Sequence, residues 1–134
     1  MKLLCFSLVT LFVASAAMAK DVTYVCRLDV PVSQQWVPSQ IAILHTEGSE
    51  TAVVNDPIIV YFLKKPATAK VAADNPQRIT FTWELPRVRN TAGQETPRFL
   101  YRASYFKKTG KVSISATPAG YPNNFNAFGT CKLG

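Results

Sequence analysis

The sequence predicts an all-β protein, a small antiparallel barrel of eight to nine strands closed by a disulfide between its first and last strands. Short apolar runs alternate with turn residues along the chain, and the strongest runs alternate apolar and polar residues. Nine Pro and six Gly in 134 residues argue against a helical bundle. Cysteines in the first and last runs favour closure of the sheet. A β-sandwich is the alternative, because a disulfide also links packed sheets.

The first 19 residues have the three parts of an export signal. Met1-Lys2 supplies a positive start, residues 3–14 are mostly apolar, and Ala17-Met18-Ala19 has the small residues of a cleavage site. The apolar run is shorter than the about 20 residues that a retained membrane helix needs. We therefore expect residues 1–19 to be cleaved and residues 20–134 to form a single exported domain, periplasmic or secreted, without a transmembrane segment.

The first half of the mature chain predicts five short strands. In residues 22–28, every second side chain from Val22 to Leu28 lies on one face, and a loop containing Pro31 and Pro38 follows. The next four runs are residues 40–46, 51–54, 58–63 and 68–72. The run 58–63 is apolar throughout and is interpreted as a buried strand, so the sequence predicts no helix.

The second half contains the clearest strands, residues 78–85, 99–107, 112–116 and 125–131. The strand 78–85 has β-branched and aromatic residues in strict alternation. Its inward face is expected to carry Ile79, Phe81, Trp83 and Leu85. Its outward Thr80 and Thr82, like Ser113 and Ser115 of a later strand, are expected to face solvent.

Two hairpins can be given a register. We expect Trp83 to lie opposite Ala103, which places Glu84 opposite Arg102 and leaves residues 91–95 as the loop. The turn Lys108-Thr109-Gly110 suits a left-handed glycine, and it would bring Tyr105 opposite Val112.

Two cysteines remain after signal cleavage, because Cys5 lies within the signal. An even pair in an exported chain predicts a disulfide between Cys26 and Cys131. A redox or nucleophilic role is the alternative, but neither cysteine belongs to a Cys-x-x-Cys motif.

No catalytic motif is present, and the eight Asp and Glu residues are scattered. His45 is the only histidine and is interpreted as a strand-end residue without a catalytic role. We therefore expect a protein that is not an enzyme and has no cofactor and no metal site.

Positive charge is the main functional signal. Without Lys2 the chain has 14 Lys and Arg against 8 Asp and Glu, a net charge of +6. Arg87, Arg89 and Arg98 flank one predicted loop and are candidates to contact an anionic polymer, a lipid headgroup or an acidic protein. A solvated basic surface without a ligand is the alternative. Nucleic acid is not expected, because no recognised binding motif is visible.

Two loop aromatics are further candidates. Trp36 and Tyr121 lie in predicted loops, where such side chains contact partners or sugars. Alternatively, each folds over the mouth of the barrel as a plug.

The chain resembles small exported bacterial proteins of uncharacterised function and, more loosely, periplasmic barrels of the lysozyme-inhibitor and calycin-like kind. Tyr24-Val25-Cys26 opens the first strand and Gly129-Thr130-Cys131 closes the last. The Tyr-x-Cys opening is similar to that of the c-type lysozyme inhibitor family. That family's Ser-Gly-rich inhibitory loop has no counterpart here, so its contact residues are not transferred. A net positive charge also opposes approach to a cationic lysozyme.

These observations favour an exported, non-catalytic binding module for an anionic envelope component, an acidic partner or a small molecule at the barrel mouth. The alternative is an inhibitor of an extracellular hydrolase, with Trp36 or residues 90–95 as the inserted wedge. A third hypothesis, a small enzyme, requires His45, tyrosines or carboxylates to converge in one cavity.

Overall fold

The computed structural model describes residues 9, 11–14 and 18–134. The predicted signal peptide, residues 1–19, lies mostly outside the described residues. Within the described residues, no helix has the length and apolar character required to cross a membrane.

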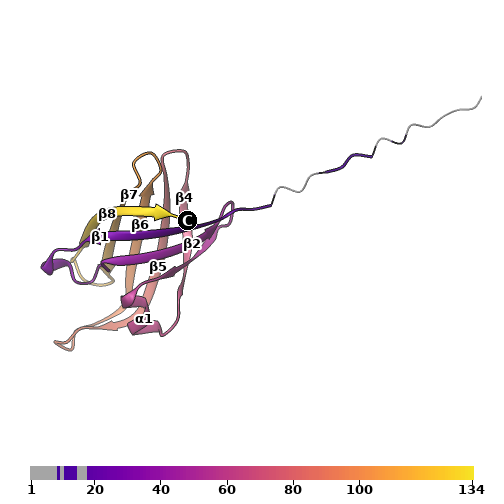
Figure 1. Ribbon diagram of the computed structural model, residues 1–134. Helices are drawn as coiled ribbons and strands as arrows, with labels where there is room; N and C mark the ends of the chain where they lie inside the picture. Colours follow the sequence, from indigo (N-terminus) through magenta and orange to yellow (C-terminus); the bar gives the residue numbers. More distant parts are fainter. Residues whose placement is uncertain (1–8, 10, 15–17) are drawn as a thin grey trace, which may run out of the picture.

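The described chain forms an eight-stranded antiparallel barrel in which each strand pairs with its neighbours in sequence and the last pairs with the first (Figure 1). The strands are β1 (Asp21–Asp29), β2 (Gln40–Thr46), β3 (Thr51–Asn55), β4 (Ala67–Asp74), β5 (Arg78–Arg89), β6 (Glu95–Phe106), β7 (Lys111–Pro118) and β8 (Phe125–Leu133). A short 3-10 helix, η1 (Val32–Gln34), follows β1, and helix α1 (Pro57–Leu63) follows β3. The predicted barrel is confirmed, and the β-sandwich alternative is wrong.

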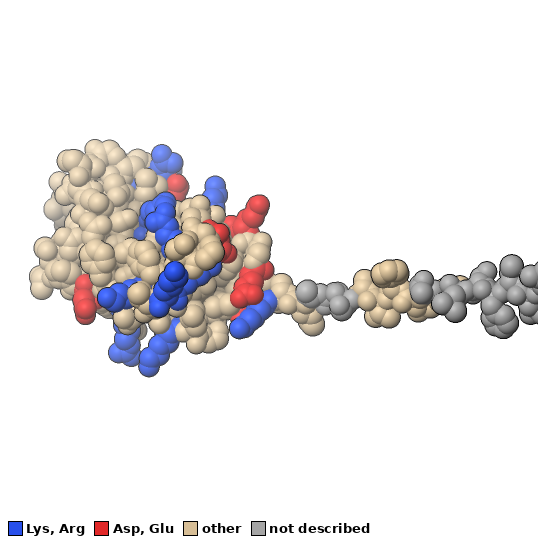
Figure 2. All heavy atoms as spheres, turned by 90° about the horizontal axis from the view of Figure 1, so that it is seen from above, with Lys and Arg blue, Asp and Glu red and all other residues tan. Residues whose placement is uncertain are grey.

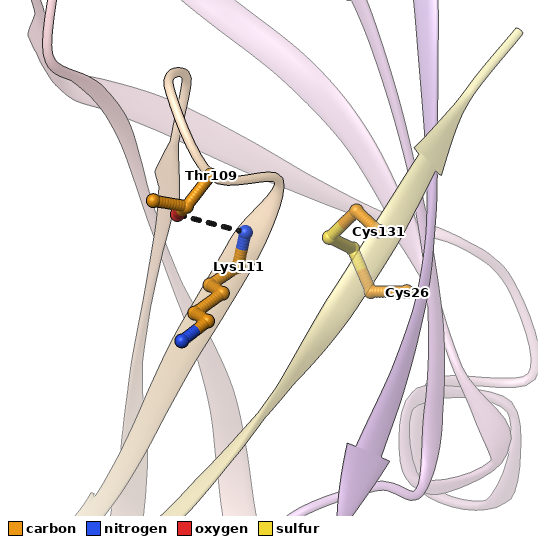
Figure 3. Close-up of a disulfide and its surroundings, with 4 residues drawn as sticks. All are labelled: Cys26, Thr109, Lys111 and Cys131. Carbon is orange, nitrogen blue, oxygen red and sulfur yellow. Dashed lines mark hydrogen bonds between the residues drawn. A yellow bond between two sulfur atoms is a disulfide. The ribbon is translucent and has the colours of Figure 1, made fainter.

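The disulfide joins the two strands that close the barrel. Cys26 of β1 lies directly opposite Cys131 of β8, and their sulfur atoms are bonded (Figure 3). Nearby on β8, Gly129 lies opposite Leu28. A β-carbon on Gly129 would clash with the backbone carbonyl of Arg27, so only glycine permits this close approach of β1 and β8.

The expected strand at residues 58–63 is wrong, because this segment is helix α1. The Asp56 carboxylate caps the helix and accepts hydrogen bonds from the backbone N–H groups of Ile58 (2.8 Å) and Ile59 (2.9 Å). Pro57 occupies the first turn, where its missing N–H costs nothing. The side chain of Ile59 is fully buried, so the helix is attached to the core through its apolar face.

The register expected between β5 and β6 is wrong by two residues. Trp83 pairs with Tyr101 instead of Ala103, and Thr82, instead of Glu84, pairs with Arg102. A shift by two keeps every side chain on its predicted face, because strand side chains alternate with a period of two residues. The second hairpin is as expected: Tyr105 pairs with Val112, and Gly110 has φ 72°.

Aromatic rings fill the interior of the barrel. Trp83 and Tyr101 stack with ring centroids 5.5 Å apart, and Phe99 lies 5.4 Å from Tyr101. Further along, Tyr24 lies 5.6 Å from the ring of Phe81. Contacts between such rings add to the hydrophobic free energy of burial.

The prediction that the Thr80 side chain faces solvent is wrong. It is 0% exposed, and its hydroxyl lies 2.8 Å from that of Ser104, the residue opposite it on β6. The two hydroxyls satisfy each other, which removes the main cost of burying them.

Candidate functional site at the loop end

The two ends of the barrel are built differently. One end, here named the turn end, has the short connections 47–50, 75–77 and 107–110. The other, named the loop end, has the connections 30–39, 56–66, 90–94 and 119–124. Figure 1 shows α1 and the projecting β5–β6 hairpin together at the loop end. Binding residues concentrate on such connections, so this end is the candidate site.

The β5–β6 hairpin extends beyond the barrel wall. Both strands are longer than predicted, and they bend at Arg87, whose φ of 50° is uncommon for a residue other than glycine. Beyond the bend, Val88 pairs with Thr96 and both are buried. The hydroxyl of Thr96 lies 2.7 Å from the carbonyl oxygen of Ala119, which links the hairpin to the connection 119–124.

The tip of this hairpin is exposed but internally hydrogen-bonded. The side-chain oxygen of Asn90 accepts a hydrogen bond from the Gln94 backbone N–H at 2.9 Å. The Asn90 amide donates to the Gln94 side chain at 2.8 Å, and the Gly93 N–H donates to the Asn90 carbonyl at 3.1 Å. The tip is therefore held in one conformation before any partner arrives.

Trp36 covers the loop end of the core. Its ring centroid lies 5.0 Å from that of Phe99 in the barrel wall and 6.0 Å from that of Phe62 in α1. Its carbonyl oxygen accepts a hydrogen bond from the buried Tyr101 hydroxyl at 2.8 Å. Trp36 is half-buried, so it plugs the mouth of the barrel while part of its surface remains available.

Two surface hollows flank Trp36. The smaller, about 90 Å³, lies toward the 119–124 connection. Its polar and aromatic lining includes Trp36, Asn90, Gln94, Tyr121, Asn123 and Phe125. The larger, about 430 Å³, lies toward α1, and its lining includes Gln35, Trp36, Tyr61, Phe62, Arg89 and Asn90. Both hollows therefore combine aromatic surface with amide groups, and the larger adds a guanidinium group.

The three candidate arginines lie on the hairpin but differ in their partners. Arg89 forms an ion pair with Glu95 at 3.1 Å, and Arg98 forms one with Glu84 at 3.8 Å. Arg87 is exposed and has no ion-pair partner among the described residues. Of the three, Arg89 is the one that lines a hollow together with Trp36. Both ion pairs are exposed, and such pairs contribute about 0–1 kcal/mol, so an acidic ligand can replace them.

Tyr121 lines the smaller hollow together with Trp36. The residue is 42% exposed, and its hydroxyl lies 3.4 Å from the Glu95 carbonyl oxygen. Trp36 lines both hollows, Tyr121 lines the smaller one and Arg89 the larger one, so three of the residues selected from the sequence lie around the same end of the barrel.

Tyr61 was not selected from the sequence, although it is 69% exposed beside the larger hollow. The sequence Asn55-Asp56-Pro57 could have indicated its position, because an Asp that caps a helix and a Pro in the first helical turn are typical of a helix start. Once residues 57–63 are read as a helix, exposed Tyr61 follows the buried Ile59 on a surface helix above the barrel.

His45 is separated from this site. It is buried near the turn end, where its Nε2 atom lies 2.8 Å from the Ser49 carbonyl oxygen and its ring packs edge-on against Phe81. Within residues 9, 11–14 and 18–134, no group of three His, Cys, Asp or Glu side chains is placed to hold a metal ion.

Two buried titratable groups lie beneath the loop end. Burial raises the pKa of the Asp56 carboxyl above its usual value, and the hydrogen bonds from Ile59 and Ile58 partly oppose this. Burial also raises the pKa of Tyr101, with a smaller contribution from the charge of Asp56. Tyr101 therefore acts as a neutral hydrogen-bond donor to Trp36.

Comparison with known proteins gives no relative: the chain matches no protein-family model, no curated protein and no solved structure.

Proposed function

We propose that this protein is an exported, non-catalytic binding module that binds an anionic glycan of the cell envelope at its loop end. The observation that carries the proposal is the placement of Arg89 in one hollow with Trp36 and Tyr61. A guanidinium group binds a carboxylate through two parallel hydrogen bonds. Aromatic faces beside it offer an apolar surface to a sugar ring.

The amide side chains around Trp36 support a polar ligand. Asn90 lines both hollows, and Gln94 and Asn123 line the smaller one. Amides both donate and accept hydrogen bonds, as the hydroxyl groups of a glycan require. The net positive charge would speed the approach of an acidic chain at low salt.

Tryptophan fluorescence tests the proposal, because Trp36 is half-buried at the site whereas Trp83 is buried in the core. We expect a uronic-acid oligosaccharide to change the emission at about 10 mM salt, where charges are weakly screened. A neutral oligosaccharide of equal length should bind more weakly. Arg89→Gln should weaken binding of the acidic chain several-fold, while Arg102→Gln, on the outer wall, should not. Binding that is absent, or unaffected by Arg89→Gln, would contradict the proposal.

A second function, inhibition of an extracellular hydrolase, is favoured by the projecting tip at residues 90–94. A pre-ordered, exposed loop inserts into an enzyme cleft with little loss of conformational entropy. The hydrogen bonds of Asn90 and Gln94 supply that order. Trp36 is less suited to the wedge role, because it packs between Phe62 and Phe99.

A panel of c-type lysozymes and serine proteases tests this second function. Inhibition by the wild-type protein should disappear when residues 91–94 are replaced by glycine and serine, and it should weaken with Asn90→Ala. Arg89→Gln, which is expected to weaken glycan binding, should leave the inhibition largely intact, which separates the two functions.

A further inference from the structure

A second surface lies away from the loop end, on the outer wall near the turn end. Phe106 of β6 is 37% exposed and Phe128 of β8 is 69% exposed. The two rings line one mostly apolar surface hollow together with Lys108 and Lys111. An exposed pair of phenylalanines beside lysines is unusual on a free surface, because it leaves large apolar area in water.

Strand pairing extends the positive charge across this surface. Phe106 lies opposite Arg78 of β5, and Lys111 of β7 lies opposite Thr130, which in turn lies opposite Arg27 of β1. We name this surface the Phe106–Phe128 face, and its members are Arg27, Arg78, Phe106, Lys108, Lys111 and Phe128. All six side chains are exposed.

The charge of this face is not neutralised within the described residues. None of its four basic side chains forms an ion pair there, and Asp29, opposite Phe128, is the acidic residue paired with a member of the face. Figure 2, which looks onto the turn end, shows Lys and Arg side chains over the middle and lower part of the molecule and none at its upper left. Most of the Asp and Glu visible there gather on the side where the chain enters β1.

We propose that the Phe106–Phe128 face docks on the surface of an anionic phospholipid membrane. Lys and Arg are attracted to the phosphate groups of anionic lipids, and aromatic rings settle at the boundary between headgroups and acyl chains. This face provides both kinds of group side by side. Four of its six members border or lie in the turns 75–77 and 107–110, whereas the hollow that Arg89 shares with Trp36 lies at the loop end, so docking leaves that hollow free for its own ligand.

Vesicle co-sedimentation tests the proposal with residues 20–134, which contain every strand of the barrel. We expect binding to phosphatidylcholine vesicles that contain phosphatidylglycerol at about 10 mM salt, and little binding to phosphatidylcholine alone. Binding should fall several-fold at about 1 M salt, where the Debye length is about 3 Å.

Substitutions test whether vesicle binding occurs through the Phe106–Phe128 face. Lys108→Gln combined with Lys111→Gln should reduce partitioning at least five-fold, and adding Phe128→Ser should reduce it further. The matched control removes two lysines and one exposed apolar residue at the loop end: Lys64→Gln, Lys65→Gln and Val60→Ser, where Val60 of α1 is 49% exposed. This control should bind as the wild type does. All variants replace exposed residues, so unchanged thermal unfolding confirms that they fold.

Three results would overturn the proposal. The first is no binding to the anionic vesicles, and the second is an equal loss of binding in the control variant. The third is binding of soluble polyphosphate as strong as that of vesicles and unaffected by Phe128→Ser, which would identify a polyanion site without membrane insertion.

Discussion

The hydroxyl of Tyr101, inside the barrel, donates a hydrogen bond to the carbonyl oxygen of Trp36 at 2.8 Å. This bond joins the packed interior to the loop that covers it, across 65 residues of sequence. It acts beside the ring contacts of Trp36 with Phe62 and Phe99, and Trp36 lines both hollows at the loop end.

Tyr101→Phe should lower the free energy of unfolding by about 1–2 kcal/mol, because the Trp36 carbonyl loses its partner in a part-buried site. Trp36 emission should also shift as its loop loosens. Tyr105→Phe is the control, since the Tyr105 hydroxyl has no hydrogen-bond partner among the described residues, and it should change the free energy less. Urea unfolding measures both variants, and equal effects would contradict the prediction.

Removal of the disulfide with Cys26→Ser and Cys131→Ser should lower the free energy of unfolding by about 3–5 kcal/mol, because the bond closes a loop spanning 105 residues. The same loss should appear in the wild-type protein under reducing conditions, and a reductant should leave the double variant unchanged. A loss below about 1 kcal/mol would show that strand pairing alone closes the barrel.

Gly129→Ala should lower the free energy of unfolding by about 3 kcal/mol or more, because the added methyl group meets the backbone of Arg27 and Leu28, which a side-chain rotation cannot relieve. The comparison is Thr130→Ala, at the next, exposed position of β8. Thermal unfolding should place Thr130→Ala within a few degrees of the wild type. Equal stability of Gly129→Ala and the wild type would show that β1 and β8 can separate without cost.

Asp56 predicts a specific pH dependence. Its pKa is raised in the folded state, so folding favours the protonated carboxyl. The stability it contributes is present below the unfolded pKa of about 4 and is lost as the pH rises through the folded pKa. The difference in unfolding free energy between wild type and Asp56→Asn should therefore fall as the pH rises from about 3 to about 7.

The variant Asp56→Ala separates the helix-capping hydrogen bonds of Asp56 from the effect of its charge. It removes the acceptor for Ile58 and Ile59 and should cost about 1 kcal/mol relative to Asp56→Asn at every pH, because Asn also caps helices. Urea unfolding at several pH values checks both statements. If the unfolding free energy of the wild type minus that of Asp56→Asn rises with pH, the assignment of Asp56 as a buried carboxyl with a raised pKa is contradicted.

The pattern of apolar residues in the sequence predicted the eight strands of the barrel and their inward faces, since side chains in a strand point alternately to the two faces. The disulfide was predicted separately, because the first and the last predicted strands each carry one cysteine. Alternation defines the face of a residue but not its partner, because a shift by two residues preserves every face. The β5–β6 register was therefore decided by the tertiary structure, in which Trp83 stacks on Tyr101.

The tertiary structure also decided that residues 58–63 form a helix, and it decided which residues make up the site. A short apolar run suits a strand or a helix equally, and the choice here follows from the Asp56 cap and the burial of Ile59 against the barrel. Trp36, Arg89 and Tyr121 lie far apart in the sequence. They lie around the two hollows because barrel closure in strand order places the connection 30–39, the end of β5 and the connection 119–124 at the same end.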